Sequence, residues 1–236
     1  QILSAIEFEE GGTADFELPS VSGSFTYTTD ALFYNCYKLS SIAFPARLVK
    51  IGDNALYWGE AIAGRSNHNI SVVTFAPDCR LNEIGKSAFK NCKIKEIELP
   101  ASVTAIGSGA FSGCSSLKKI VVPSGVECIA EEMFYECASL TEIVLSNTLK
   151  EIKRAAFAHC IALESIELPE SVTAIGTGAF RECVALKKIV VPSGVECIAK
   201  EMFYECASLT EVALPNTLKE IGANAFYNCG ALESIE

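Results

Sequence analysis

A 23-residue repeat constrains this chain more than any other feature. The Phe of a Phe-x-x-Cys motif recurs at spacings of 22 or 23 residues, and two further anchors extend the series toward the N-terminus. The nine anchors are Phe33, Leu56, Phe89, Phe111, Phe134, Phe157, Phe180, Phe203 and Phe226. A fixed period of this length indicates a stack of similar coils. The 236 residues therefore predict one linear array rather than one or two globular domains.

Each unit places apolar residues in a fixed order. The Phe-x-x-Cys motif is followed by Leu-x-x-Ile-x-Leu-Pro, as in residues 163–169, and then by Val172 and Ile175-Gly176. Alternation in Ile-x-Leu is typical of a half-buried strand, which the Pro ends. Identical strands one period apart pair in parallel. We predict an α/β solenoid with one short strand per repeat and a short helical or 3₁₀ turn on the opposite side.

A longer repeat lies on top of the short one. Residues 98–166 aligned with residues 167–235, three units further on, are identical at 53 of 69 positions. The sequence therefore indicates that a block of three units was duplicated intact.

The repeat also explains most of the 11 cysteines. Eight of them hold the same position in their units: Cys36, Cys92, Cys114, Cys137, Cys160, Cys183, Cys206 and Cys229. Zinc sites use short paired spacings, and the side chains of stacked cysteines run parallel to each other. We therefore predict buried free thiols and no metal site. Cys79, Cys128 and Cys197 lie outside this column.

The unit resembles the BspA-type leucine-rich repeat of bacterial surface proteins. The resemblance rests on Leu-x-x-Ile-x-Leu-Pro, Val-x-x-Ile-Gly and Ala-Phe-x-x-Cys, and it covers about residues 31–236, with a preceding strand in residues 1–8. It implies a curved, right-handed leucine-rich-repeat solenoid that is secreted or displayed at a bacterial cell surface. It further implies an adhesive or protein-binding role without a catalytic site.

Several function classes are disfavoured by composition. A net charge of −10 argues against binding to nucleic acid, which needs clustered Lys and Arg. The sequence contains no run of 18 apolar residues, so we predict no membrane insertion. His159, one of two histidines, is expected to be a solvent-facing turn residue before Cys160. We predict no enzymatic activity and no cofactor.

Two segments break the repeat. Residues 57–69 form an insertion before a strand predicted at 70–75, and they include Tyr57 and Trp58, which are candidate binding residues because aromatic loop residues often bind partners. The alternative is that both rings fold over the coil edge in place of the missing Phe and Cys. Residues 1–30 are predicted to be an irregular N-terminal coil or cap of one domain spanning residues 1–236.

The outward positions of the predicted strands offer a second candidate surface. Its residues are Lys118, Lys119, Val121, Glu142 and Val144. One interpretation is that Val121 and Val144, flanked by these charges, bind a partner. The other is that opposite charges on adjacent coils form weak cross-strand pairs that keep the sheet soluble.

The predicted function is non-enzymatic binding to a protein, such as a host matrix protein or a surface protein of a neighbouring cell. The alternative is a structural spacer that presents another domain, which the close similarity of the two 69-residue blocks favours. The sequence stops within a predicted strand at Ile235-Glu236. We therefore expect either that the natural chain continues or that this end associates with another molecule.

Overall fold

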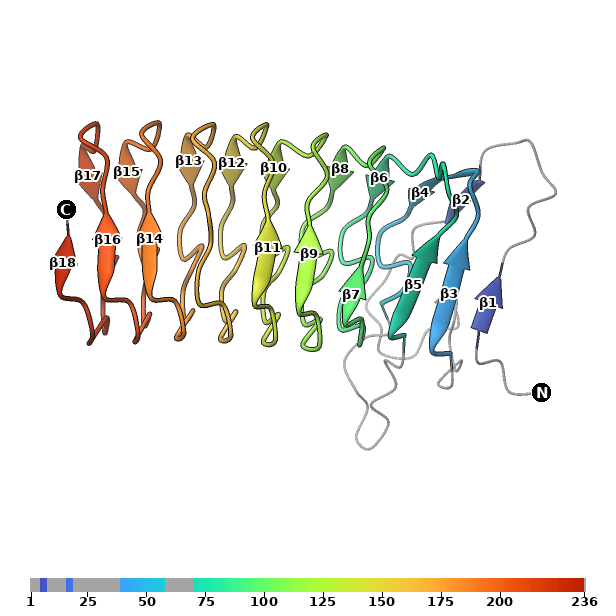
Figure 1. Cartoon of the computed structure of the whole chain (residues 1–236), viewed down its shortest axis with the longest axis horizontal. Helices are drawn as coiled ribbons and strands as arrows, with labels where there is room; N and C mark the ends of the chain where they lie inside the picture. Colours follow the sequence, from blue (N-terminus) through green and yellow to red (C-terminus); the bar gives the residue numbers. More distant parts are fainter. Residues whose placement is uncertain (1–4, 8–15, 19–38, 58–69, 236) are drawn as a thin grey trace.

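The computed structural model describes residues 5–7, 16–18, 39–57 and 70–235 (Figure 1). These residues form a solenoid whose coils follow one another along a straight axis in the view of Figure 1. All strand pairs among them are parallel and join neighbouring coils. The predicted parallel stack of 23-residue units is confirmed.

Two sheet faces run along the solenoid. The first sheet face consists of β1 (Ala5–Glu7), β3 (Ser41–Phe44), β5 (Val72–Phe75), β7 (Glu96–Ile97), β9 (Lys119–Val121), β11 (Glu142–Val144), β14 (Lys188–Val190), β16 (Glu211–Ala213) and β18 (Ser234–Ile235). The second sheet face consists of β2 (Phe16–Leu18), β4 (Leu48–Ile51), β6 (Glu83–Ile84), β8 (Ala105–Ile106), β10 (Cys128–Ile129), β12 (Glu151–Ile152), β13 (Ala174–Ile175), β15 (Cys197–Ile198) and β17 (Glu220–Ile221).

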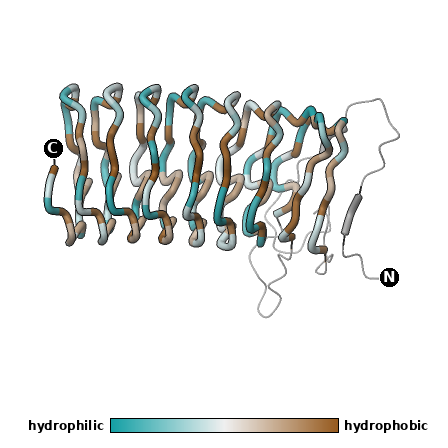
Figure 2. The backbone as a smooth tube through the Cα atoms, viewed as in Figure 1, coloured by the Kyte–Doolittle hydropathy of each residue, from teal (hydrophilic) through white to brown (hydrophobic). Residues whose placement is uncertain are grey.

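The second strand of each coil goes beyond the single strand that the sequence predicts. It forms because the segment that ends at the second Ile of each unit also alternates, so that Ile129 is buried while Cys128 is only partly buried. On the first sheet face the same alternation buries Ile120 and exposes Val121. Figure 2 shows the apolar segments recurring at matching places in successive coils.

Neither sheet face is continuous. The first sheet face is divided into the groups β1-β3-β5, β7-β9-β11 and β14-β16-β18. Between β11 and β14, the coil of Ile166 contributes only an isolated bridge from Ser165 to Lys188. This interruption falls at the junction of the two similar 69-residue blocks.

The N-terminal part continues the solenoid. Strand β1 pairs with β3, which confirms the strand predicted within residues 1–8, and β2 pairs with β4. The segment predicted as an irregular cap thus contributes one strand to the second sheet face. Strand β5 matches the strand predicted at residues 70–75.

A column of phenylalanine rings fills the core. Seven rings, from Phe89 to Phe226, stack on one another with centroids 5.3–5.8 Å apart and interplanar angles of 15° or less. Each ring is therefore covered by the coils before and after it. A coil in the interior of the solenoid depends on both neighbours for burial.

We call the segment around each Phe the turn segment. Alternate residues of this segment donate backbone hydrogen bonds to the next coil. The backbone N–H groups of Glu132, Phe134 and Glu136 donate to carbonyl oxygens of the following coil at 2.9–3.0 Å. Glu132 and Glu136 have φ angles of 56° and 58°, in the left-handed region. These angles point their N–H groups along the solenoid axis instead of into a helix.

The predicted helical or 3₁₀ turn is therefore wrong for the described residues, in which the turn segments are hydrogen-bonded turns without a helix. A helix would keep the N–H groups within one coil. Left-handed residues before and after each Phe prevent this, and the same pattern recurs at Ala155 and His159 in the next coil.

The cysteine column is confirmed as a column of buried free thiols from Cys92 to Cys206, and the thiol of Cys229 is partly buried. Cys92 donates to the carbonyl of Leu56, and from Cys114 onward each thiol donates to the Phe carbonyl of the preceding coil, as Cys160 Sγ does to the oxygen of Phe134 at 3.2 Å. That oxygen also accepts the N–H of Cys137 at 3.1 Å. Burial raises the pKa of the Cys160 thiol to about 12, so the thiol stays protonated and able to donate.

Cys79 lies outside the column but is also buried, with its thiol 3.6 Å from the carbonyl oxygen of Pro45. Cys128 is partly buried and Cys197 is exposed at the equivalent position of the second block. The position that Cys128 and Cys197 share is thus partly covered in the first block and open to solvent in the second.

We expect Cys160→Ala to lower the free energy of unfolding by about 1–2 kcal/mol, because it removes a buried hydrogen bond and leaves a small cavity. Cys197→Ala, at an exposed position, should change it by less than about 0.5 kcal/mol. Urea unfolding monitored by circular dichroism measures both. Equal effects of the two substitutions would contradict a structural role for the cysteine column.

Candidate functional site

Two exposed valines lie side by side on the first sheet face. Strands β9 and β11 pair in a register that places Val121 beside Val144, and these residues are 50% and 45% exposed. The same register places Lys119 beside Glu142, with Nζ 2.6 Å from Oε1. The hydrogen bond to the Glu142 carboxylate raises the pKa of Lys119, so this ammonium stays charged. The arrangement is an apolar pair with an ionic pair on one side.

A groove of about 860 Å³ opens beside these residues, and we call it the sheet groove. Its lining includes three of the predicted binding residues, Lys119, Val121 and Val144, together with Leu99 and Pro123. Glu142 borders it through its ion pair with Lys119, and Lys118 is the exposed residue that precedes Lys119. The groove offers apolar contact and the charged side chain of Lys119 to a polypeptide.

The predicted cross-strand charge pairs are also present. Besides Lys119 and Glu142, the pairs Lys187–Glu164 and Lys188–Glu211 join neighbouring coils at 2.6 and 2.5 Å. These side chains are exposed, and such pairs contribute at most about 1 kcal/mol each. The first sheet face therefore combines solubilising ion pairs with exposed valines.

Tyr57 lies apart from the sheet groove and does not line it. The ammonium of Lys90, in the next turn segment, lies 5.3 Å from the centre of the Tyr57 ring. Trp58 and the rest of the insertion, residues 59–69, lie outside the described residues, as do Phe33 and Cys36. The structure thus brings together the candidate residues of the sheet and places Tyr57 outside the groove that they form.

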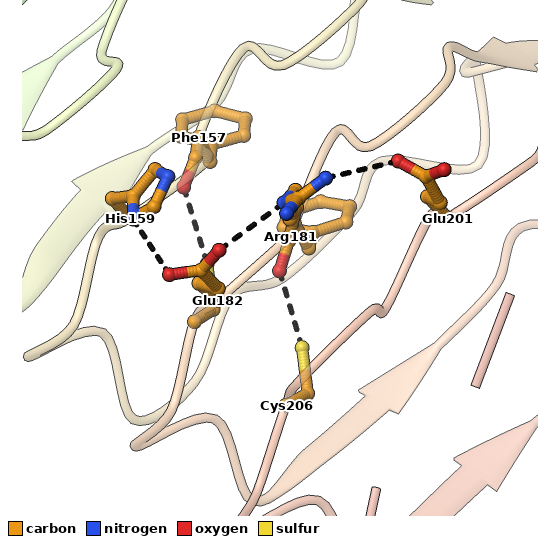
Figure 3. A network of polar contacts seen from close by, with 8 residues as sticks. Phe157, His159, Arg181, Glu182, Glu201 and Cys206 are labelled. Carbon is orange, nitrogen blue, oxygen red and sulfur yellow. Dashed lines mark hydrogen bonds and ion pairs between the residues drawn. The ribbon is translucent and has the colours of Figure 1, made fainter. Parts of the chain in front are cut away.

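The turn segments carry a polar network that sequence reasoning missed (Figure 3). Glu182 accepts from His159 Nδ1 at 3.0 Å and from Arg181 Nε at 3.2 Å, and Arg181 Nη1 lies 3.1 Å from Glu201. The guanidinium of Arg181 also lies 4.4 Å from the centre of the Tyr204 ring. His159 is thus a partly buried member of a network spanning three coils rather than a solvent-facing residue.

One signal in the sequence could have revealed this network. The counterparts of Arg181 and Glu182 in the first block are Ser112 and Gly113. The counterpart of His159 in the second block is Asn228. Polar residues that differ between otherwise similar blocks mark a place where the blocks make different contacts. The network joins adjacent coils, and its polar side chains are paired with one another.

The described residues give no sign of metal chemistry or of a membrane span. Within them, no group of three His, Cys, Asp or Glu side chains is placed to hold a metal ion. The described part of the chain also lacks any helix with the length and hydropathy to cross a bilayer.

The fold and the sheet groove define a leucine-rich-repeat solenoid, a class that generally serves protein interaction and is typically a non-enzymatic scaffold. The model of the BspA type leucine rich repeat region matches residues 8–75, 29–160, 82–195 and 127–236. The chain belongs to this BspA-type family, as its repeat motifs indicated.

Solved bacterial structures agree with this assignment. A leucine-rich repeat protein from Bacteroides ovatus is 27% identical with a TM-score of 0.70, and the match covers 98% of this chain and 65% of that one. The T. pallidum leucine-rich repeat protein TpLRR is 33% identical with a TM-score of 0.63, over 69% of this chain and 77% of that one.

A leucine-rich cell surface protein from Faecalibacterium prausnitzii shares the fold at 21% identity and a TM-score of 0.55, over 100% of this chain and 88% of that one. No curated protein matches the chain. This chain spans about two thirds of the length of the Bacteroides ovatus protein.

We expect Glu182→Gln to lower the free energy of unfolding by about 1 kcal/mol at low salt, because it weakens the partly buried ion pair with Arg181 and the contact with His159 at once. Glu164→Gln, which affects one exposed pair, should have a smaller effect. Urea unfolding in 20 mM and 1 M NaCl measures both, and salt should reduce the difference. An equal, salt-independent effect of the two substitutions would show that the network does not stabilise the turn segments.

Proposed function

We propose that this chain is a non-enzymatic protein-binding module of a bacterial surface protein, and that its binding site is the first sheet face around the sheet groove. The observation that carries the proposal is the pair of half-exposed valines at the groove. Water covers these side chains in the free protein, and a partner that removes this water gains about 25 cal/mol per Å² of apolar surface buried.

The ionic pair next to the valines supports specificity. Lys119 and Glu142 lie within 2.6 Å of each other, so a partner meets a charge of each sign beside the two valines. Lys118, which forms no ion pair within the described part of the chain, adds a cation that is available to a carboxylate. Complementary charges raise the rate and selectivity of association more than the final affinity.

The proposed setting is outside the cell, where the partner is a host matrix protein or a surface protein of a neighbouring cell. The support is the cell-surface description of the Faecalibacterium prausnitzii protein with the same fold, together with family membership. Adhesion would then follow from binding of the displayed sheet face.

A spacer role is the second candidate function. It is favoured by the 53 identical positions in the two blocks and by ion pairs that tie successive coils together. A spacer needs uniform, well-connected coils but no exposed valines beside a groove. The same experiment separates the two functions.

The experiment measures binding of the chain to a panel of immobilised extracellular matrix proteins by surface plasmon resonance. We expect Val121→Glu and the double variant Lys118→Glu/Lys119→Glu to weaken binding at least about tenfold, as hot-spot substitutions do. Glu98 already occupies the register position of Val121 in the preceding coil, so the fold tolerates Val121→Glu.

Arg181→Ala, in the turn segments, is the matched control and should bind as the unaltered chain does. Trp58→Ala tests the insertion separately. Unchanged binding by both sheet variants would refute the site, and an absence of binding to the whole panel would support the spacer function.

A further inference from the structure

The two similar 69-residue blocks differ mainly in their turn segments. Of the 16 positions that differ, 12 lie in residues 107–116, 130–139 and 153–162 or their counterparts in the second block. The outward residues of the first sheet face are almost unchanged. The blocks thus keep one sheet surface while their turn segments diverge.

The structure builds a similar surface twice, with Ala213 in the second copy at the position of Val144 in the first. We call Lys119, Val121, Glu142 and Val144 the first station. The second station consists of Lys188, Val190, Glu211 and Ala213, three coils further on, in the same strand register. Both stations hold their Lys–Glu pair, at 2.6 and 2.5 Å.

The stations share an exposed apolar residue as well as an ion pair. Val190 is 63% exposed, and Val121 is 50% exposed. An exposed valine is common singly, but two in equivalent places on one face form a repeated apolar contact.

An exposed carboxylate precedes each station. Glu98 lies one coil before Val121, and Glu167 lies between Val144 and Val190, at the same position of their repeats. Neither carboxylate forms an ion pair within the described residues. A Lys or Arg can lay its aliphatic stem on a valine and bring its charge to such a carboxylate.

The separation of the stations fits an extended chain. Three steps of about 4.8 Å, the spacing of paired strands, give about 14 Å. The steps of 5.5–5.7 Å between the Phe rings of the same coils give about 17 Å. An extended polypeptide rises about 3.4 Å per residue and covers either distance in four or five residues.

We propose that the first sheet face binds an extended segment of its protein partner that runs along the solenoid and contacts both stations. Two apolar side chains of the segment, four residues apart and therefore on the same face of the extended chain, contact Val121 and Val190, and a Lys or Arg between them faces Glu167. This inference rests on the proposed function and adds the second station and the chemistry of the partner. Two linked contacts bind more tightly than either alone.

The test begins with a displayed library of random 12-residue peptides selected on the whole chain. Selected peptides should share two apolar residues four positions apart with a basic residue midway between them, so that all three side chains lie on one face. The best peptide is synthesised, and its dissociation constant is measured by fluorescence anisotropy. We expect Val121→Glu and Val190→Glu each to weaken binding about tenfold and the double variant about a hundredfold.

A charge exchange tests the central contact. Glu167→Lys should weaken binding of the peptide about tenfold, and replacing the basic residue of the peptide by Glu should restore it. Val184→Glu, at an exposed position of a turn segment, is the control and should bind as the unaltered chain does. Circular dichroism checks that each variant is folded.

The outcomes separate this inference from the proposed function. A loss of binding with Val121→Glu but not with Val190→Glu would overturn the second station and leave the first as the binding site. Unchanged binding by the double variant would overturn both. Selected peptides without the apolar and basic pattern would refute the proposed chemistry of the partner.

Discussion

Hydrogen bonds from one coil to the next are the constraint on which this structure depends. In each turn segment, alternate N–H groups leave their own coil and donate to the following one, as those of Phe157 and His159 do at 2.8 Å. The Phe rings and the cysteine thiols then fill the space that these bonds define. A coil without neighbours would lose its backbone partners and the cover of its ring together, so the stack is stable only as a series.

Because these bonds and inward side chains hold the coils together, the residues of the outer surface are free to vary. Inward residues are fixed by stacking, whereas the outward residues of the strands contribute little to the core. Retention of the Lys–Glu pair and the exposed valine in both blocks is therefore not required by packing. The turn segments diverge instead, and one result is the network of His159, Arg181 and Glu182, whose counterparts Asn228, Ser112 and Gly113 are smaller or uncharged.

The stack of coils could be predicted from the sequence, because the 23-residue period and the order of apolar residues in each unit determine which side chains pack in the core. It was insufficient for the turn segments, since Gly or Asn holds the left-handed positions only in some coils, as at Gly109 and Asn224, whereas Glu132 and His159 in other coils do not mark such a conformation. The second sheet face was missed because its strands have only two residues in most coils. The candidate residues of the sheet could be placed on one face from alternation alone, whereas the sheet groove depends on how Leu99 and Pro123 lie beside them.

Hydrogen exchange of the variant Phe157→Leu tests the dependence of each coil on its neighbours most directly. Leu56 holds the anchor position in its own coil and is fully buried, so the solenoid accepts this substitution. Mass spectrometry of peptic fragments follows exchange in each coil. We predict faster exchange in the turn segments around Phe134 and Phe180 as well as in the altered coil, and little change near Phe89. Faster exchange confined to the altered coil, or spread evenly over the chain, would contradict the account.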